Sequence, residues 1–404
     1  MTEAFGHVAT ILEVLLLVPV ALFFVGTAVS HVLTWYYFAR YDRIYLSKGT
    51  NPPVSVIKPV KGVDQSAEEN FRSFCEQNYP NGHEILFCVE GRADPAVSVI
   101  EEIIEEYPDR DIRLGFSDPE DAKSLGKMKN MIVGFRHSSH GVIVFSDSDA
   151  RVPPDFLRRT VACLGDPRVG LGFSAPAYEG AEDWPAALMA VSANAFVLRL
   201  ASMCLFGRFD GAVGTTMVTR REVIEEVGGL ERFGRQASDD IPLAREIHNA
   251  GYRIHLLGQP TRVFHPHYTF GEWWQHLHRW LVNIRHYWPA NFWITSVVDL
   301  APWWVLAHLV VTLLAGGDPW ADAGLLAAVL GVSVASTAVI NARFVRDGAF
   351  WRYLWVVFVQ EAVRLPLVVY SSVTSEVSWR GRRLRIAPDC TVKLVPERGE
   401  RWSG

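Results

Sequence analysis

Long apolar stretches lie near both ends of the chain, whereas the middle alternates short apolar runs with polar ones. The stretch Val14 to Phe38 has no Lys, Arg, Asp or Glu and exceeds the roughly 20 residues that a helix needs to cross a bilayer. Basic residues follow this stretch instead of preceding it, which favours a membrane span over a signal peptide. We therefore expect a transmembrane helix over residues 1–40, followed by cytoplasmic chain marked by Arg40, Arg43 and Lys48.

From Asn51 to about Tyr287 the pattern is typical of a soluble domain. Short apolar runs predict strands, and the stretches between them have helical spacing. The predicted strands are Val54–Ile57, Glu84–Val89 and Gly141–Phe145, and the predicted helices are Ala67–Gln77 and Pro95–Glu106. This alternation predicts one α/β domain over residues 51–287, with a parallel-rich sheet that has helices on both faces and binds ligands where its strands end.

Apolar density rises again over residues 290–375, where we expect C-terminal membrane segments. Phe292–Ala315 and Trp320–Ile340 predict a transmembrane hairpin. The loop between these two segments is acidic, with Asp318 and Asp322, and is expected outside. The chain after the second segment is basic, with Arg343 and Arg346, and is expected on the cytoplasmic side.

The third apolar segment, Tyr353–Val373, is less simple. Glu361 and Arg364 share a helix face in its middle and are expected to pair, and Pro366 follows them. Basic residues flank both ends, which favours a re-entrant or interfacial element over a full third span. Residues 376–404 are expected to form a basic cytoplasmic tail that includes Arg380, Arg382, Arg383 and Arg385.

One apolar stretch lies inside the central region. Ala186–Gly207 is interrupted only by Arg199. Its pattern fits a core helix and a helix lying in the membrane interface equally well, so both interpretations stay open.

Composition excludes some functions. The 404 residues suffice for one large domain plus membrane segments. The formal net charge of -5 and the lack of a continuous basic face argue against a nucleic-acid partner. The five cysteines are scattered and odd in number, which predicts reduced thiols in a cytosolic compartment instead of a disulfide framework or a zinc site.

Candidate ligand-binding carboxylates follow the first two predicted strands. Asp64 ends the run after the first, and Asp94 lies in the turn after the second. A carboxylate at the end of a parallel strand can accept hydrogen bonds from a base or from ribose hydroxyls. Asp94 could equally cap the helix that opens at Pro95.

The third predicted strand ends in Ser146-Asp147-Ser148-Asp149. Two carboxylates at positions i and i+2 can together hold a divalent cation, with diphosphate oxygens and water completing the coordination. Asp-x-Asp is also common in solvated turns, but its place directly after an apolar strand favours a Mg²⁺ or Mn²⁺ site.

A second acidic pair, Ser238-Asp239-Asp240, precedes an apolar-periodic helix from Ile241 to Ala250. We expect one carboxylate to cap this helix. The other is available as a general base, and the two neighbours raise each other's proton affinity towards neutrality.

The last cluster runs from Trp273 to Trp280. Arg279 offers a planar fork suited to a diphosphate, and Trp280 offers an apolar face suited to a sugar or an acceptor. The pattern also fits an amphipathic interfacial helix anchored at headgroup depth. Both interpretations hold for an enzyme that acts on a lipid.

Taken together, these clusters resemble the ceramide glucosyltransferase family, within the large family-2 group of GT-A glycosyltransferases. The resemblance covers nearly the whole chain, from the first span to the Trp379-Arg380-Gly381-Arg382-Arg383 tail. The residues that carry it are Lys58-Pro59-Val60-Lys61-Gly62-Val63-Asp64, Asp94-Pro95-Ala96, Ser146-Asp147-Ser148-Asp149, Ser238-Asp239-Asp240 and His276-Leu277-His278-Arg279-Trp280.

Carried over by position, the resemblance implies a role for each matching residue. Asp240 is the general base, Asp149 with Asp147 binds the metal, and Trp280 contacts the acceptor. The implied nucleotide-sugar-binding residues are Asp64, Asp94, Lys127, Asn130, Asp147 and Arg279. The sequence departs from the family pattern at His276, where Gln or Arg is usual, and at Glu90-Gly91-Arg92, which replaces a more acidic turn.

The resemblance implies an inverting transfer of a hexose, in the first instance glucose, from a UDP-sugar to a lipid hydroxyl. Ceramide is the expected acceptor, and the alternative is a hopanoid that receives N-acetylglucosamine. A processive polysaccharide synthase and a catalytically inactive binding protein are further alternatives. His265 and His267 could approach the metal, although a structural role is the simpler interpretation.

Overall fold

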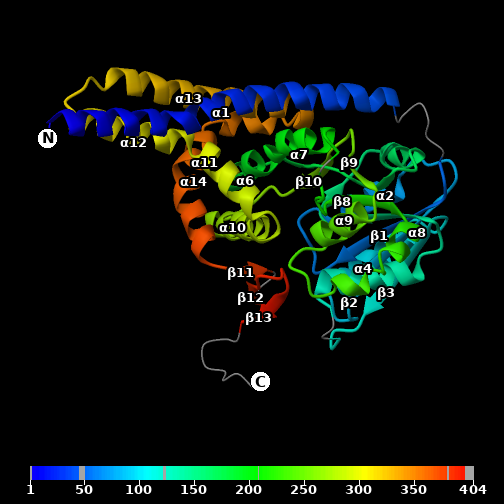
Figure 1. The fold of residues 1–404 in the computed structure, drawn as a ribbon. Coiled ribbons are helices and arrows are strands. Elements are labelled where there is room, and N and C mark those ends of the chain that lie inside the picture. Colours follow the sequence, from blue (N-terminus) through cyan, green and yellow to red (C-terminus); the bar gives the residue numbers. More distant parts are fainter. Residues whose placement is uncertain (1, 45–50, 122–123, 208, 380–381, 396–404) are drawn as a thin grey trace. The chain divides into compact units, whose positions relative to one another are not determined.

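The computed structural model describes residues 2–44, 51–121, 124–207, 209–379 and 382–395 (Figure 1). Lys48, Arg380 and the side chain of Arg43 lie outside this description. The chain divides into two compact units, and α1 (Thr2–Ile44) contributes to both. We call Leu33–Ala181 with Phe196–Pro266 the sheet unit, and Met1–Val32 with Glu182–Ala195 and His267–Gly404 the helical unit.

The sheet unit is built around a seven-stranded sheet in the order β3-β2-β1-β4-β8-β6-β9. The first four strands are parallel, whereas β8 runs antiparallel to both of its neighbours. All residues of β1 and β4 are buried, which explains their nearly continuous apolar sequences. In chain order the strands are β1 (Val54–Val60), β2 (His83–Glu90), β3 (Asp111–Ser117), β4 (Val142–Ser146), β6 (Val169–Phe173), β8 (Thr216–Arg220) and β9 (Arg253–Leu256).

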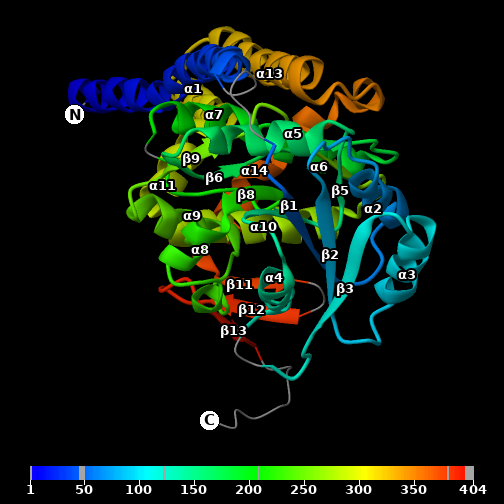
Figure 2. The ribbon, with the colours of Figure 1, turned by 90° about the vertical axis from the view of Figure 1, so that its right-hand side faces the viewer.

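Helices cover both faces of this sheet (Figure 2). On one face, Phe71 of α2 (Ala67–Cys75) and Ile100 of α3 (Ala96–Glu106) join the core formed by the strands. On the other face lies α4 (Gly126–His137), whose approach depends on Gly134. A Cβ atom at Gly134 would lie 2.4 Å from Cγ2 of Ile57, so a larger residue would push the helix off the sheet.

The remaining elements of the sheet unit surround the later strands. A separate three-stranded sheet has the order β5-β10-β7, and in it Ala150 pairs with Val263. Its strands are β5 (Ala150–Arg151), β7 (Pro176–Glu179) and β10 (Thr261–Phe264), and the helices are α5 (Phe156–Val161), η1 (Ala162–Gly165), α7 (Phe196–Leu205), α8 (Arg221–Glu226), η2 (Glu231–Phe233) and α9 (Asp240–Asn249).

The expected fold class, a parallel-rich α/β sheet with flanking helices and apolar helices towards both ends, is confirmed. β1 and β2 contain two of the predicted strands, β4 overlaps the third from Val142 onwards, and α2 and α3 match the two predicted helices. The prediction missed the other four strands of the main sheet, β3, β6, β8 and β9. Of these, β3 lies at the edge of the sheet, and only Ile112 and Ser117 of its seven residues are buried, so its apolar signal is weak.

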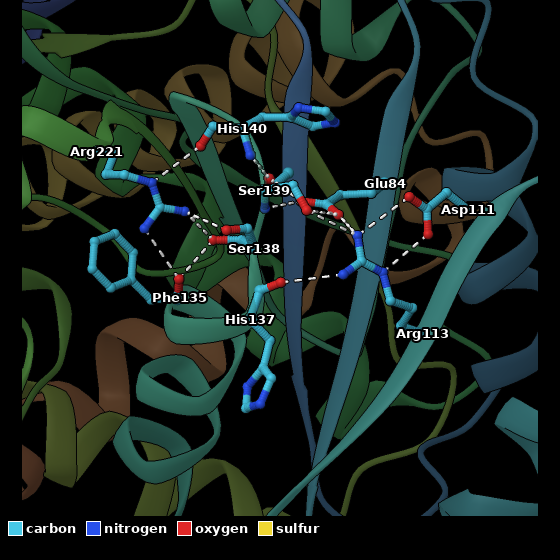
Figure 3. A network of polar contacts seen from close by, with 10 residues as sticks. Glu84, Asp111, Arg113, Phe135, His137, Ser138, Ser139, His140 and Arg221 are labelled. Atoms are coloured by element: carbon cyan, nitrogen blue, oxygen red, sulfur yellow. Dashed lines mark hydrogen bonds and ion pairs between the residues drawn. The ribbon is translucent and has the colours of Figure 1, made fainter.

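A polar network lies at the amino ends of the parallel strands (Figure 3). The buried carboxylate of Glu84 accepts hydrogen bonds from Ser55 and from the backbone N–H and hydroxyl of Ser139, and it pairs with Arg113. Nearby, Arg221 donates to the carbonyl oxygen of Phe135 in the last turn of α4 and to those of Ser138 and His140 in the α4–β4 connection. These contacts fix the connection that enters β4.

The helical unit contains α6 (Trp184–Asn194), α10 (Phe270–Tyr287), α11 (Pro289–Asp299), α12 (Ala301–Leu314), α13 (Trp320–Ile340), η3 (Asn341–Val345), η4 (Ala349–Tyr353) and α14 (Val356–Val373). Within the described residues, four helical stretches are long and apolar enough to cross a membrane, and the bent pair α11–α12 is a possible fifth. The four are Ile11–Arg40, Trp184–Leu205, Trp320–Val345 and Val356–Val373. These apolar helices fit a membrane-associated protein.

Two apolar stretches differ from their sequence-based description. The segment expected over Phe292–Ala315 is broken at Leu300 and bends by 56°, because Pro302 cannot continue the helix of the preceding residues. Ala186–Gly207 forms two helices, α6 and α7, and the stretch Trp184–Leu205 is 67% buried, compared with 17% for Ile11–Arg40. That burial favours the core-helix interpretation.

Within the third apolar segment, Tyr353–Val373, the continuous helix α14 begins at Val356 and continues through Pro366. The expected pair is present, with Glu361 and Arg364 side chains 3.3 Å apart. The described part of the basic tail is folded, because β11 (Glu376–Trp379), β12 (Arg382–Ile386) and β13 (Val392–Leu394) form an antiparallel sheet. Glu376 neutralises two of its arginines, Arg383 and Arg385.

Candidate active site

Three charged side chains from distant parts of the sheet unit meet where the parallel strands end. Lys127, in the first turn of α4, places its Nζ atom 2.7 Å from Oδ1 of Asp147 and 2.8 Å from Oδ2 of Asp239. Asp147 directly follows β4, and Asp239 directly precedes α9. One lysine therefore holds together the two acidic motifs found in the sequence.

Asp240 lies beside this cluster, and hydrogen bonds fix both of its carboxylate oxygens. Its Oδ2 accepts from the backbone N–H of Gly214 at 2.6 Å, and its Oδ1 accepts from the N–H of Ile241 at 2.7 Å and from the hydroxyl of Ser238. A Cβ atom at Gly214 would lie 3.1–3.2 Å from Lys127 Nζ and from both aspartates. Gly214 thus lets the backbone approach the acidic pair closely.

Asp149 lies next to a histidine. The pairing of β5 with β10 brings His265 to Asp149, with Nε2 and Oδ2 3.2 Å apart. His267, in contrast, contacts Asp183 in the helical unit at 3.2 Å. Among the described residues, no group of three or more His, Cys, Asp or Glu side chains is arranged to hold a metal ion by itself.

The donor set nevertheless suits a hard divalent cation that shares its coordination with a substrate. Asp147 and Asp149 offer carboxylate oxygens, and the Nε2 atom of His265 lies 3.2 Å from Oδ2 of Asp149. Mg²⁺ in particular is usually bound by one or two carboxylates, with substrate phosphates and waters filling the other positions. These residues fit such an ion.

The carboxyl end of β1 contributes a buried lysine and an acidic residue. Lys58 is fully buried, donates from Nζ to the carbonyl oxygen of Asp147 at 2.8 Å, and lies 3.8 Å from the centroid of the Phe74 ring. Asp64 accepts a hydrogen bond from Ser148 at 2.5 Å. Both contacts join the carboxyl end of β1 to the Asp147–Asp149 turn and stabilise it.

Two residues assigned to the nucleotide-sugar use their side chains within the fold. Asp94 accepts from the backbone N–H groups of Gly62 and Ala96, at 2.9 Å each for Oδ1, so it joins the loop after β1 to the start of α3. Asn130 is buried and donates to the carbonyl of Val60 at 3.0 Å. Their contact with a nucleotide-sugar stays a prediction.

Arg279 and Trp280 belong to α10 in the helical unit, which begins with a capping box at Thr269. The guanidinium carbon of Arg279 lies 5.3 Å from the centroid of the Trp379 ring. His276, the position where the motif departs from the family pattern, packs edge-on against Trp280 with centroids 4.6 Å apart. The three residues of the motif thus form one cluster with the C-terminal sheet.

The electrostatics of the cluster follow from burial and from crowding of charge. Burial raises the pKa of Asp147 to about 6, Lys127 opposes this, and Asp149 and Asp239 add to it. Burial, and next Asp239, raise the pKa of Asp240. Burial alone would lower the pKa of Lys127, but the two aspartates that it contacts raise it. The lysine therefore stays charged, and the carboxylates hold protons more readily than usual.

Sequence reasoning assigned no role to Lys58, although it belongs to one of the motifs, and did not notice Gly214. Burial lowers the pKa of Lys58 to about 7, against the opposing charges of Asp149 and Asp147. A lysine inside an otherwise apolar strand was a usable signal, because such a side chain needs a specific partner. Gly214 gave no comparable signal, since its importance depends on side chains far away in the sequence.

Comparisons with known proteins show the family to which the chain belongs. A family model described as glycosyl transferase family 21 matches residues 16–392. Ceramide glucosyltransferase 1 of Caenorhabditis elegans is 23% identical over 368 residues, which cover 87% of this chain and 78% of that protein. The ceramide glucosyltransferase of Komagataella phaffii is 32% identical over 114 residues, which cover 28% of this chain and 22% of that protein.

Among solved structures, a mannosyltransferase from Pyrobaculum calidifontis in complex with GDP-Man and Mn²⁺ is similar with a TM-score of 0.48 and 22% identity, over 85% of this chain and 99% of that chain. The family model alone covers most of the present sequence. The expected relationship to ceramide glucosyltransferases is therefore confirmed, and the chain is a glycosyltransferase that belongs to glycosyl transferase family 21.

Proposed function

We propose that this glycosyltransferase moves glucose from UDP-glucose to the primary hydroxyl of a lipid, with ceramide as the first candidate, and inverts the anomeric configuration. The names of its curated relatives support this donor and acceptor class. The observation that carries the proposal is the convergence of Asp147 and Asp239 on Lys127, with Asp240 held alongside. These groups supply the charges that a nucleotide-sugar displacement needs.

In this mechanism Asp240 is the general base. It takes the proton from the lipid hydroxyl while that oxygen forms a bond to the anomeric carbon. The bond from this carbon to the diphosphate breaks, and UDP departs with the electron pair. The Gly214 N–H and the Ile241 N–H fix the carboxylate, so its orientation does not depend on substrate.

Asp149, Asp147 and His265 would hold Mg²⁺ or Mn²⁺ at the turn after β4. When bound, the ion neutralises negative charge on the departing diphosphate. Lys127 keeps the acidic turn and the base together, and Lys58 anchors the backbone of Asp147. Asp64, Asp94 and Asn130 keep their assignment to the nucleotide-sugar as part of this proposal.

Two residues of the helical unit complete the proposed assignments. Arg279 binds the diphosphate through its planar guanidinium, and Trp280 contacts the acceptor. We further propose that the sheet unit faces the cytoplasm, where nucleotide-sugars are available, and that in a bacterium the protein lies in the inner membrane. The basic residues after the first span support this orientation.

The test is a product analysis with purified protein in lipid nanodiscs. UDP-glucose and UDP-N-acetylglucosamine are each offered with ceramide and with a hopanoid, and products are identified by mass spectrometry. Glucosylceramide with inverted configuration is expected. An N-acetylglucosaminyl hopanoid would replace the proposed substrate pair, a polymer would indicate a processive synthase, and no product with any pair would reject the proposal.

The role of the base is tested by Asp240→Asn in the same assay. We expect turnover of the folded protein to fall about 10²- to 10⁴-fold while UDP-sugar binding is kept, because the change removes proton transfer. Asp166→Asn is the matched control, since Asp166 pairs with Arg168 at the surface. Wild-type turnover of the Asp240 variant would exclude it as the base.

A further inference from the structure

One side of α14 is apolar and exposed along the whole helix. Exposed positions recur every three or four residues, from Trp355 just before the helix to Val373 at its end, with Ala362 near the middle. The larger members of this exposed stripe are Trp355, Phe358, Pro366, Val369, Tyr370 and Val373. A stripe of 18 residues is about 27 Å long.

The opposite side of α14 is buried, and it combines the apolar residues Val356, Val357, Leu367 and Val368 with the polar residues Glu361 and Ser371. Glu361 pairs with Arg364, whose Nη1 donates to the carbonyl oxygen of Asp299 at 2.9 Å. Ser371 contacts Nδ1 of His278 at 2.9 Å. A helix on a water-exposed surface turns its polar residues outward, so the apolar exposed side of α14 requires an apolar covering.

Aromatic rings connect the beginning of α14 to its end across the same surface. Centroid distances are 6.4 Å from Trp355 to Trp184, 5.9 Å from Trp184 to Phe270, 6.3 Å from Phe270 to Trp274, and 5.9 Å from Trp274 to Tyr370. Trp and Tyr are enriched at the headgroup level of both membrane surfaces. If α14 crossed the bilayer, the middle of this row of rings would lie in the hydrocarbon, whereas a helix in the membrane plane keeps the whole row at headgroup level.

The helix that supports this surface is too polar to enter the hydrocarbon. α10 contacts the end of α14 through Arg285, which donates to the carbonyl of Thr374 at 3.0 Å, and Phe270 at its other end is linked to Trp355 through the ring of Trp184. Between them α10 carries Glu272 and Arg279. A charge at the bilayer centre costs about 2.5–3.5 kcal/mol on insertion scales, so a crossing α14 would drag α10 into an unfavourable depth.

The flanking sequence and the direction of α14 agree. Basic residues precede the helix at Arg346 and Arg352 and follow it in β12, as expected when both ends stay on one side. Within the helical unit, α14 runs steeply away from the paired helices α12 and α13 (Figure 1). If that pair crosses the bilayer, α14 follows the surface.

We propose that α14 does not cross the membrane but lies in its interface, with the exposed stripe towards the acyl chains and the aromatic rings at headgroup level. The partner of this surface is the lipid bilayer itself. The chain after α13 then crosses no further, so the loop at Gly348 and the C-terminal sheet lie on the same side. This assignment does not depend on the donor or acceptor proposed above.

Sidedness is tested with single cysteines and a membrane-impermeant maleimide on sealed vesicles. The positions are Gly348, where an added side chain meets open space, and Lys393, which is exposed in β13. Ala315→Cys, in the loop between α12 and α13, marks the other side of the membrane. The unchanged protein is the control for background labelling of the native cysteines, all of which are buried. We expect Gly348→Cys and Lys393→Cys to react from the same side. Reaction from opposite sides would show that α14 crosses and would overturn the proposal.

Depth is tested by nitroxide labels at Phe358→Cys, Ala362→Cys and Val373→Cys in nanodiscs, with collision rates for oxygen and for a water-soluble nickel complex. An in-plane helix gives the same shallow, oxygen-rich depth at all three positions, and Val310→Cys on α12 provides the deep reference. A depth that peaks at Ala362 would indicate a span. High nickel access at all three would show that the stripe meets water, and it would equally reject the lipid contact.

Discussion

The two ends of the parallel strands carry polar clusters of opposite design. At the amino ends, Glu84 is completely buried, and its oxygens receive hydrogen bonds from Ser55 and Ser139 and an ion pair from Arg113. At the carboxyl ends, four carboxylates, those of Asp147, Asp149, Asp239 and Asp240, gather around Lys127 and His265. One cluster matches its donors to its acceptors, whereas the other accumulates negative charge.

The difference separates a structural cluster from a reactive one. A buried carboxylate with matched donors stabilises the fold and has no affinity left for a ligand. Crowded carboxylates repel one another, and the repulsion is relieved by a bound cation or by a proton. If the proposed assignment of the site is right, one end of the sheet serves rigidity and the other serves chemistry, and substitutions at the two ends should have different consequences.

The largest effect is expected from removing the metal. Treatment with a chelator, or Asp149→Ala, should lower turnover about a thousandfold, because an ion of this type contributes several kcal/mol to charge stabilisation. The measurement is turnover as a function of added Mg²⁺ and Mn²⁺. Glu84→Gln should keep the wild-type metal dependence. If Asp149→Ala and Glu84→Gln both lost it, the two ends of the sheet would not differ in function.

A smaller but still large effect is expected at Gly214. In Gly214→Ala the new Cβ atom would press on Lys127, Asp239 and Asp240 at 3.1–3.2 Å and displace the base. A displacement of this kind should reduce kcat about 10- to 100-fold and leave the KM for the donor nearly unchanged. The control is Gly141→Ala, where added atoms meet open space. An unchanged kcat in the Gly214 variant would mean that Asp240 needs no exact placement.

The amino-end cluster should respond in stability instead of activity. Glu84→Gln replaces an acceptor by a donor opposite Arg113 and Ser139, which leaves buried groups unpaired and costs about 1–3 kcal/mol. Thermal unfolding of the purified protein should show a midpoint lower by a few degrees, with an unchanged kcat for the folded fraction. A loss of kcat without a loss of stability would contradict the structural role.

The smallest effect is a shift in pH dependence. Asp240 accepts a proton only when ionised, so kcat/KM should fall as the pH drops through its pKa, which burial and Asp239 raise. Asp239→Asn removes the contribution of Asp239 and should move this fall to lower pH. Glu226→Gln, a distant change at a residue that contacts Tyr252, should leave the profile in place. A profile that stays fixed or moves to higher pH in Asp239→Asn would argue against Asp240 as the titrating base.

Local patterns in the sequence predicted the parts of this structure that depend on local physics. Apolar runs located β1, β2 and β4. Because the apolar run of β4 ends just before Asp147, the sequence also placed Asp147 and Asp149 in the turn after this strand. Helix periodicity likewise placed Glu361 beside Arg364. In each case the relevant residues lie within a few positions of one another.

Features that depend on tertiary contacts could not be obtained in this way. The bridge from Lys127 to Asp239, the partners of Glu84 and the role of Gly214 all join residues that are remote in sequence. The division of the chain is of the same kind, since residues 182–195 and 267–287 fall in the helical unit although their composition suited the predicted 51–287 domain. At Asp94 the structure does not choose between the two proposed roles. Its carboxylate accepts from the N–H of Ala96 at the start of α3, and a ligand contact by the same side chain stays compatible with this.

Because the polypeptide passes between the two units four times, near residues 32, 181, 195 and 266, neither unit is a contiguous cassette. Even if residues 1–32 and 267–404 were both removed, Glu182–Ala195 of the helical unit would remain between the two segments of the sheet unit. Protein engineers who want the sheet unit alone would have to replace that segment with a new loop, and ribosomes must deliver nearly the whole chain before the helical unit can close.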